Sequence, residues 1–395
     1  MNAQSESASG QAQPSAPRRM RSSLELSRGA DTRRRVGTLL GQGLLLAVTS
    51  ASAVAVLFIF LFIIREALPF FRLRGFVEFF THKAWYPSAD PPEFGSLAIF
   101  VGSGLVTAGA VLFAVPLGVF AAVCLSDILP FAIRQAVKPV IEVLASIPSV
   151  AYGFFALVVL APLLQDHGGR LLAAGVWIAG LPVAMLVCVL LAEAIVHALH
   201  LTASRVPRLA ILLILGVLSC IALGVLARRA DAVAVSSGAN ALNVSLILAV
   251  MVLPTVVSVS EDALQAVGRE LREASYACGA TRAETIVRVV LPAASSGICS
   301  AVILGLMRAV GETMVVWMAS GNAAQIPKPW YNLLQPVRTL TATIAGEMGE
   351  ADQVTGSARY HVLFAMALCL LVISFTCNMG SEWVVRRERR KLRGQ

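Results

Sequence analysis

The chain has 395 residues, of which 57% are hydrophobic and only 14% are charged. Soluble domains usually contain about 25% charged residues, so this composition excludes a soluble enzyme, a disordered chain and a small disulfide-built scaffold. It predicts an all-α protein that crosses a membrane several times. The formal charge of +9 is then better explained by basic loops on the cytoplasmic side than by nucleic-acid binding.

The first 36 residues are rich in Ser, Ala, Gln and Arg and contain no apolar run. Such a segment cannot bury enough apolar surface to fold, so residues 1–36 are predicted to form a disordered basic tail in the cytoplasm. A second basic cytoplasmic tail is predicted at 386–395. The transmembrane domain is expected between them, over residues 37–385.

Eight apolar stretches follow in chain order, each with at least the about 20 residues that a membrane-spanning helix needs. Eight spans place both termini on one side, and the basic residues of the loops gather on that side, which predicts that both termini are cytoplasmic. The predicted spans cover 36–64, 94–126, 143–165, 171–192, 209–227, 232–260, about 293–321 and about 362–381.

A charged loop of good helix formers, residues 261–292, joins the sixth and seventh predicted spans. Its pattern predicts a short helix, a turn at Gly279 and a second helix that ends near Leu291 and Pro292. A helix along the cytoplasmic membrane surface could receive mechanical force from a soluble partner. A solvated connector would have the same composition.

The spacing within this loop resembles the EAA motif of bacterial ABC importer permeases. Glu273 and Ala274 open the motif, Ser275 stands for its second alanine, Gly279 follows six residues after Glu273, and Leu291-Pro292 close it. The resemblance implies the type I, MetI-like permease fold, a polytopic bundle of about eight helices. It also implies that the helix before Gly279 docks on a separate ATP-hydrolysing subunit, through residues 273–283, which include Ala280.

The segments around the loop resemble one branch of these permeases, the PstC-type subunits of bacterial phosphate importers. The matching segments are LPTVVSVSEDAL before the loop, LGLMRAVGETMVVWMASGN after it, and residues 113–127, 138–157 and 341–351. Residues 165–238 depart from that branch, because two extra spans replace a short outer connection. We expect this insertion to lie at the periphery of the bundle.

The resemblance implies a subunit of an ATP-driven phosphate importer in the bacterial inner membrane. Its implied partners are a PstA-like permease subunit, a dimer of ATPase subunits, a phosphate-binding protein on the outer loops 65–93 and 322–358, and membrane lipids. No Walker A sequence or Ser-His-Asp order is present, so we expect no catalytic residue here. ATP and Mg would bind to the ATPase partner, and no cofactor is expected in this chain.

One charged pair interrupts the seventh predicted span. Arg308 and Glu312 are four residues apart, so a continuous helix would place them on one face. An arginine at the centre of a span costs about 2.5–3.5 kcal/mol on insertion scales and usually faces the bundle interior. Its planar guanidinium matches the oxygens of phosphate, and Glu312 could hold it when the site is empty. A structural ion pair is the alternative.

Hydroxyl groups could complete such an anion site. Thr313 follows the charged pair directly, and Ser149 lies beside Pro148 in the third predicted span. A proline bends a membrane helix and frees backbone groups there. Glu193, His197 and His200 share a helix face, which is a spacing that could hold a metal ion. They lie at the cytoplasmic end of an inserted span, where polar side chains meet water, so no metal is expected.

Three other functions remain compatible with the sequence. The chain could be an ABC permease for another oxyanion such as molybdate, sulfate or phosphonate. It could be a secondary transporter or channel that works without an ATPase. It could also act in phosphate sensing as a signalling scaffold.

Overall fold

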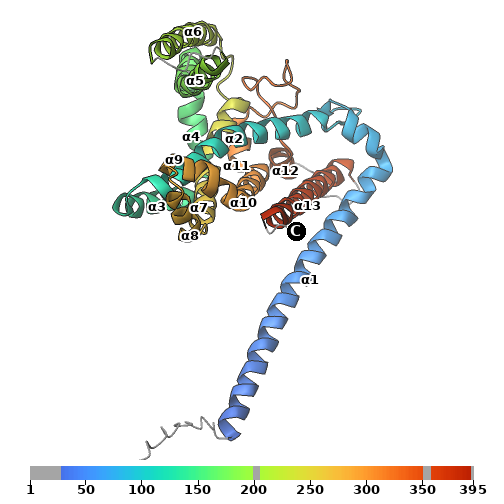
Figure 1. Ribbon diagram of the computed structural model, residues 1–395. Helices are drawn as coiled ribbons and strands as arrows, with labels where there is room; N and C mark the ends of the chain where they lie inside the picture. The colour runs from blue at the N-terminus through green and yellow to red at the C-terminus, as the bar shows by residue number, and fades with distance from the viewer. Residues whose placement is uncertain (1–27, 199–204, 350–356, 393–395) are drawn as a thin grey trace, which may run out of the picture. The chain divides into compact units, whose positions relative to one another are not determined.

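The protein is described by a computed structural model that covers residues 28–198, 205–349 and 357–392 (Figure 1). Apart from one two-stranded hairpin, all regular elements of this part are helical. The hairpin pairs β1 (Trp85–Tyr86) with β2 (Glu93–Phe94) in antiparallel register. The helices are α1 (Arg28–Thr81), α2 (Leu97–Val123), α3 (Phe131–Ser146), α4 (Ser149–Phe155), α5 (Ala161–Ala198), α6 (Arg205–Asp231), α7 (Ala241–Gln265), α8 (Arg269–Ala277), α9 (Arg282–Thr285), α10 (Leu291–Gly311), α11 (Met314–Ala319), α12 (Leu340–Met348) and α13 (Ala358–Leu392).

Three π-helical turns widen the helical segments locally. The first, η1 (Cys124–Ile128), extends α2, and the second, η2 (Ala156–Leu160), joins α4 to α5. The third, η3 (Ile286–Val290), joins α9 to α10. π-Helical turns are frequent at functional sites, and here each one lies at an end of a long helix.

The chain divides into two compact units at Leu61. Within the first unit, the described part is the beginning of α1, whose large apolar side chains such as Leu44, Leu57 and Phe58 are exposed. Exposed apolar side chains along a whole helix are what contact with lipid requires. The helix begins at Arg28, so its first turns fall within the stretch predicted as a tail, of which residues 1–27 lie outside the described part.

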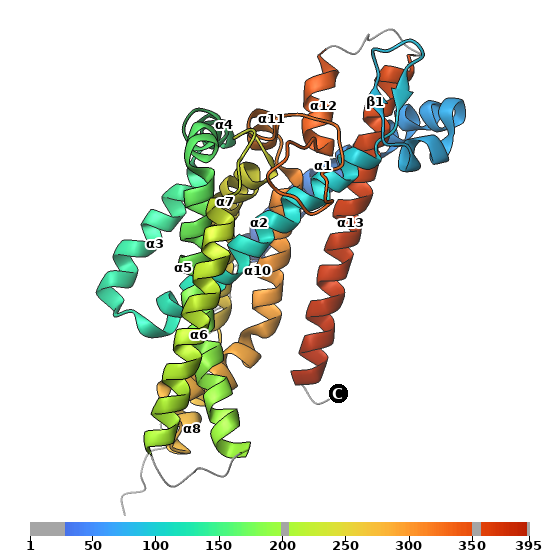
Figure 2. The same cartoon turned by 90° about the horizontal axis from the view of Figure 1, so that it is seen from above.

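The second unit is built around α7, which packs between α2 and α10 (Figure 2). Small residues let these helices approach closely. A Cβ atom added at Gly305 of α10 would lie 2.8 Å from side-chain atoms of Val252 and Val256. Gly118 of α2 packs on Val256 from the other side. Close contact through small residues is the usual way in which membrane helices associate.

A second cluster anchors the part of α1 beyond Leu61. Phe70, Phe79 and Phe94 form a set of edge-to-face aromatic contacts that is fully buried. The ring of Phe62 contacts Phe364 of α13, and His361 of the same helix binds the carbonyl oxygen of Glu66 through Nδ1 at 2.8 Å. α13 also packs on α10 and α12.

Within the described residues, seven helices are long and apolar enough to cross a membrane. The sequence predicted eight. The difference arises because 143–165 and 171–192 fall mostly into a single helical run, Ser149–Met185, that bends at His167 (φ −126°, ψ 15°). The charges from Asp166 to Arg170 were interpreted as a loop, but a single non-helical residue makes the bend. The remaining spans run over Gly37–Thr81, Leu97–Ile128, Leu209–Asp231, Ala241–Gln265, Arg282–Gly311 and Ala358–Arg387.

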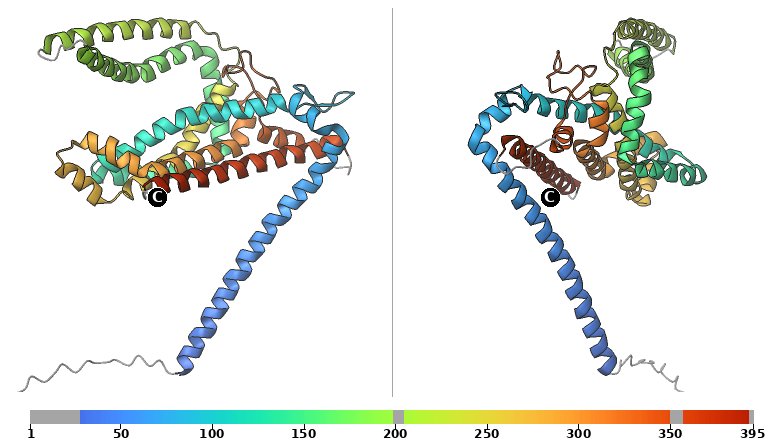
Figure 3. Two further views of the ribbon diagram at one scale, coloured as in Figure 1. Left: turned by 45° about the vertical axis from the view of Figure 1, so that its right-hand side comes forward. Right: turned by 180° about the vertical axis from the view of Figure 1, so that it is seen from behind.

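Beyond the bend, α5 lies antiparallel to α6, and the two helices pack mainly on each other (Figure 3). Among the described residues, the hairpin meets the rest of the unit near the start of α5, where η2 packs on α5 and Gly238 packs on the carbonyl of Ala161. α5 and α6 therefore form a helical hairpin within the second unit, and the interpretation of 165–238 as a peripheral insertion stays a prediction.

Candidate functional site

Arg308 lies in the last turn of α10, and the helix ends three residues later at Gly311. Glu312 has an extended backbone (φ −71°, ψ 131°) and precedes the separate short helix α11. The prediction that Arg308 and Glu312 share a helix face is therefore wrong. The apolar run continues through this break, so hydropathy alone does not reveal it. Thr341 of α12 fixes the break by donating a hydrogen bond to the carbonyl oxygen of Glu312 at 2.7 Å.

The guanidinium of Arg308 is left without its expected partner. Its Nε is buried and has no hydrogen-bond partner among the described residues. The ion pairs of the described part of the chain do not include one between Arg308 and Glu312, so the predicted structural pair is not formed. The charge of Arg308 nevertheless acts electrostatically on the carboxyl of Glu312 and on the hydroxyl of Tyr152. A half-buried arginine whose buried Nε has no partner is suited to bind an anion.

Two interrupted helices meet beside Arg308. α4 begins after an extended Ile147–Pro148 step, and α11 begins after the break at Glu312. They pack through Gly153, where an added Cβ would lie 3.2 Å from both the Met314 carbonyl oxygen and the Val315 Cα. The close approach of two broken helices is typical of substrate sites in membrane transporters.

The hydroxyl groups near the contact of α4 and α11 include the predicted Thr313 and Ser149 and one residue that was not predicted, Tyr152. Thr313 donates to the carbonyl of Gly311 at 3.4 Å, which leaves its oxygen free to accept. Ser149 begins α4 and is half-buried, but no hydrogen bond joins it to Arg308 in the described part of the chain. Sequence reasoning missed Tyr152, which follows Ser149 by about one helical turn and donates to the carbonyl of Leu144 at 2.9 Å. The only signal was a hydroxyl group in an apolar run.

The predicted helix–turn–helix loop is present at the other end of the unit. α8 carries Glu273, Ala274 and Ser275, and Gly279 makes the turn with a positive φ of 83°, which favours glycine. Glu273 and Ala274 are exposed, whereas the hydroxyl of Ser275 bonds to that of Thr285 in α9 at 2.9 Å. The serine that replaces the second alanine of the motif therefore joins the two short helices. Ala280, the residue after the turn, is half-buried.

Leu291 and Pro292 begin α10 rather than end a helix of the loop. The prediction of an ending there is wrong, because η3 carries the helix from α9 into α10 without interruption. Proline is tolerated in the first turn of a helix, and the wide turn before it rearranges the backbone hydrogen bonds.

Arg272 ties α8 to the bundle. Its guanidinium donates to the carboxylate of Asp127 in η1 and, at 2.8 Å, to the carbonyl of Leu264 in α7. These contacts join the loop to the ends of two spans. Movement of α8 would therefore be transmitted to α2 and α7 through charged hydrogen bonds rather than through a flexible connector.

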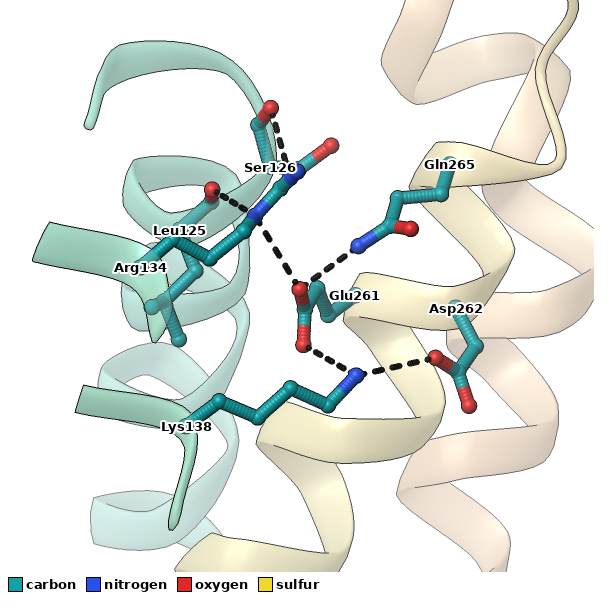
Figure 4. Close-up of polar contacts among 7 residues, drawn as sticks. All are labelled: Leu125, Ser126, Arg134, Lys138, Glu261, Asp262 and Gln265. Atoms are coloured by element: carbon teal, nitrogen blue, oxygen red, sulfur yellow. Dashed lines mark hydrogen bonds and ion pairs between the residues drawn. The ribbon is translucent and has the colours of Figure 1, made fainter. Parts of the chain in front are cut away.

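A second charged cluster lies near the same end of α7 (Figure 4). Glu261 is 1% exposed and forms ion pairs with Arg134 at 3.4 Å and Lys138 at 3.2 Å, both on α3. Gln265 also donates to Glu261, at 2.6 Å, and Lys138 reaches the exposed Asp262 at 3.6 Å. Burial opposes the charge of Lys138, but the ion pairs with both acids raise its pKa above the usual value. Sequence reasoning interpreted Glu261 as the boundary of a span.

An open cavity of about 830 Å³ lies at the opposite end of the unit from α8. It is lined by the β-hairpin and by the loops that follow α6 and α11, with Lys83, Tyr86, Lys328 and Gln335 among its residues. The predicted cluster of Glu193, His197 and His200 has side chains outside the described part of the chain. Among the described side chains, no group of three or more His, Cys, Asp or Glu could hold a metal ion.

Comparison with known proteins decides which family has this arrangement. The family model described as the binding-protein-dependent transport system inner membrane component matches residues 114–390. The chain belongs to this family. The match includes the charged loop, both broken helices and Arg308. Together with the seven apolar helices, it identifies a multi-pass permease of the inner membrane.

Characterised sequences support the same assignment. The permease is 31% identical over 299 residues to the probable ABC transporter permease protein YqgH of Bacillus subtilis, covering 76% of this chain and 74% of the relative. It is 32% identical over 310 residues to the phosphate transport system permease protein PstC of Mesorhizobium japonicum, covering 78% of each. It is 31% identical over 339 residues to PstC 1 of Mycobacterium tuberculosis, covering 82% of the permease and 86% of the relative. All three relatives are named as transport permeases rather than enzymes.

Proposed function

We propose that this permease is the PstC-type subunit of an ATP-driven importer that carries inorganic phosphate across the bacterial inner membrane. Relatives named as phosphate transport permeases match about four-fifths of the chain. The observation that carries the proposal is the Nε of Arg308, which is buried without a partner among the described residues. A planar guanidinium in a site of low polarity binds phosphate oxygens strongly and with defined geometry.

The neighbouring groups would assist binding and release. The hydroxyl of Ser149 could donate to a phosphate oxygen, and that of Thr313 could do so by exchanging its 3.4 Å bond to the Gly311 carbonyl for one to phosphate. Tyr152 lies within electrostatic range of the charge of Arg308. The carboxylate of Glu312 is also within electrostatic range of that charge. It would weaken the binding of a dianion and so favour onward movement. Arg308 would supply most of the affinity.

The ATPase subunits would exert force on the permease at α8. An ATPase dimer would bind the exposed face of α8, which presents Glu273 and Ala274. Gly279 and Ala280, which follow the helix, would lie at the edge of this contact. Leu291 and Pro292 would carry the motion into α10, on which Arg308 lies. ATP and Mg would stay in the ATPase. Both chain termini would lie on the cytoplasmic side with α8, which requires the bent run of α4 and α5 to cross the membrane twice, because seven single crossings would place the termini on opposite sides.

The other partners would complete the transport path. A PstA-like permease would pair with this chain around a pseudo-two-fold axis, so that each subunit contributes half of the path. A phosphate-binding protein would dock at the face opposite α8, on loops 65–93 and 322–358. The cavity there is lined by Lys83 and Lys328, and no acidic residue lines it among the described residues, which suits the delivery of an anion.

Uptake of radiolabelled phosphate at micromolar concentration tests the proposal. The host would lack its own importer of this type and would express the matching partner subunits. Arg308→Ala should abolish uptake while membrane insertion and co-purification of the ATPase stay normal. Arg308→Lys keeps the charge but loses the planar fork, so it should restore only part of the uptake. Arg229→Ala, at an exposed arginine of α6, is the matched control.

Four outcomes would contradict the proposal. Normal uptake in Arg308→Ala would remove the substrate site. Inhibition of wild-type uptake by excess sulfate or molybdate would indicate a permease for another oxyanion, to which a guanidinium could bind equally well. Uptake that persists with an inactive ATPase would indicate a secondary transporter or channel. Assembly without uptake would favour a role in sensing.

A further inference from the structure

The hairpin of α5 and α6 has an environment unlike that of the other paired helices. The 18-residue apolar window of α6 contains no buried residue, and large side chains such as Leu213, Ile214 and Leu218 are exposed. In a permease of the inner membrane, lipid is the medium that covers such a surface. Features of this hairpin that are neither apolar nor paired therefore indicate what kind of lipid lies against it.

One such feature is a cavity of about 410 Å³ between the two helices. The helices touch above it, where Gly169 lies against the backbone of Asp231, and again below it, where Gly180 lies against Leu223. Between these contacts the floor is formed by small residues and by the ring of Trp177. Gly224 faces that ring, and a Cβ added there would lie 3.9 Å from it.

The mouth of the cavity is charged. Arg170 and Arg228 line it from opposite helices and are both exposed, as is Asp231. No ion pair or hydrogen bond of these three side chains is found within the described residues. Two guanidinium groups and one carboxylate give the mouth a net positive charge. This arrangement leaves both arginine forks available to an anion.

The position of the cavity matches a membrane surface. The end of the hairpin at which α5 bends and α6 finishes lies away from α8 (Figures 2 and 3). Arg170 and Trp177 are separated by about two helical turns, roughly 10 Å along the axis. Arginine beside the headgroups with tryptophan just beneath them is the order expected at a membrane–water interface.

We propose that this cavity binds the headgroup of an anionic glycerophospholipid. Arg170 and Arg228 would hold the phosphodiester, and an acyl chain would lie along Trp177 and Gly224. Basic pockets between membrane helices are known to select lipid headgroups. The site is independent of Arg308 and rests only on insertion of this permease in a membrane.

The test measures lipid retained by the purified importer complex. Samples would be incubated with phosphatidylglycerol or phosphatidylcholine of the same acyl chains and analysed by native mass spectrometry. Arg170→Ala/Arg228→Ala should lower the apparent affinity for phosphatidylglycerol about tenfold or more. Arg229→Ala, the adjacent exposed arginine that does not line the cavity, should retain the wild-type affinity.

A second variant tests the cavity without altering its charges. Gly224→Leu would fill the space beside Trp177 and should also reduce retention, while monodispersity and ATPase co-purification report intact assembly. Equal retention by the double variant and the wild type would overturn the proposal. So would equal retention of phosphatidylcholine. Displacement of the lipid by millimolar inorganic phosphate would instead identify a site for the free ion and would also overturn it.

Discussion

The helices α6 and α7 illustrate two ways in which an apolar segment is used in one membrane protein. α6 is the more apolar of the two, yet none of its spanning window is buried, whereas 67% of the corresponding window of α7 is buried. α7 is also the one that carries buried polar groups. Asn243 donates to the carbonyls of Ala156 and Gly238, each at 3.0 Å, and Ser245 donates to that of Val106.

The difference follows from what surrounds each helix. Lipid offers no hydrogen-bond partner, so a helix that faces lipid must be apolar on every side. A helix that faces protein can carry polar side chains because neighbouring backbones satisfy them. In this permease, polar residues within a span therefore identify the central helix more reliably than hydropathy does.

The largest expected effect comes from Glu261, the buried carboxylate of the central helix α7. Glu261→Ala would leave Arg134 and Lys138 without their shared partner near the buried end of α7. Removing one member of a buried ion pair costs about 3–5 kcal/mol, and the partial exposure of both basic residues places the expected loss at the lower end. Thermal or denaturant unfolding of the purified complex would measure it. Asp262→Ala is the matched control, because Asp262 is 67% exposed and should lose no more than about 1 kcal/mol. Equal losses in the two variants would contradict this interpretation.

Two glycine substitutions compare the packing against α7 with the surroundings of α6. Gly305→Ala should destabilise the protein by about 1–3 kcal/mol, because the new methyl group would press on Val252 and Val256. Gly216→Ala of α6 places its methyl group where nothing lies within 4 Å. It should be neutral or slightly stabilising, since alanine favours helix. A similar loss at both positions would show that the hairpin is covered by protein in the assembled complex.

A smaller effect is expected from pH. The pKa of Lys138 is raised in the folded protein above its ordinary 10.5. Its ion pairs therefore contribute fully below pH 10.5, and this contribution is lost as the pH rises through the higher folded-state value. Unfolding measured from pH 9 upward should show this loss in the wild type. Lys138→Met should lack that component, and an unchanged pH dependence in this variant would assign it to other groups.

The fold class and the loop could be predicted from sequence because both depend on local patterns. Long apolar runs locate the spans, and the spacing from Glu273 to Gly279 locates the helix and turn that the structure contains. The bend at His167 could not be predicted in the same way. Charged residues at Asp166 and Arg170 resemble a loop whether the helix stops or only bends.

The geometry around Arg308 depends on tertiary contacts and was predicted only in part. The arginine itself stands out in an apolar run, but the break after Gly311 is held by a bond from Thr341 to the carbonyl of Glu312, two residues that are 29 positions apart. Tyr152 comes from another helix altogether. Glu261 resembled a boundary because its partners, Arg134 and Lys138, are more than 120 residues away in sequence.

The helix from Arg282 to Gly311 is continuous and carries Arg308 near its far end, so a tilt of the helix at its beginning would displace Arg308. The helix would pivot at the π-helical turn Ile286–Val290, and the segment before this pivot begins close after the turn at Gly279. The 18 residues from Val290 to Arg308 span about 27 Å at 1.5 Å per residue, so a tilt of about 10° would sweep the guanidinium through about 5 Å. That displacement exceeds the length of a hydrogen bond, so a small rotation at one membrane surface would suffice to make or release an anion contact far from it.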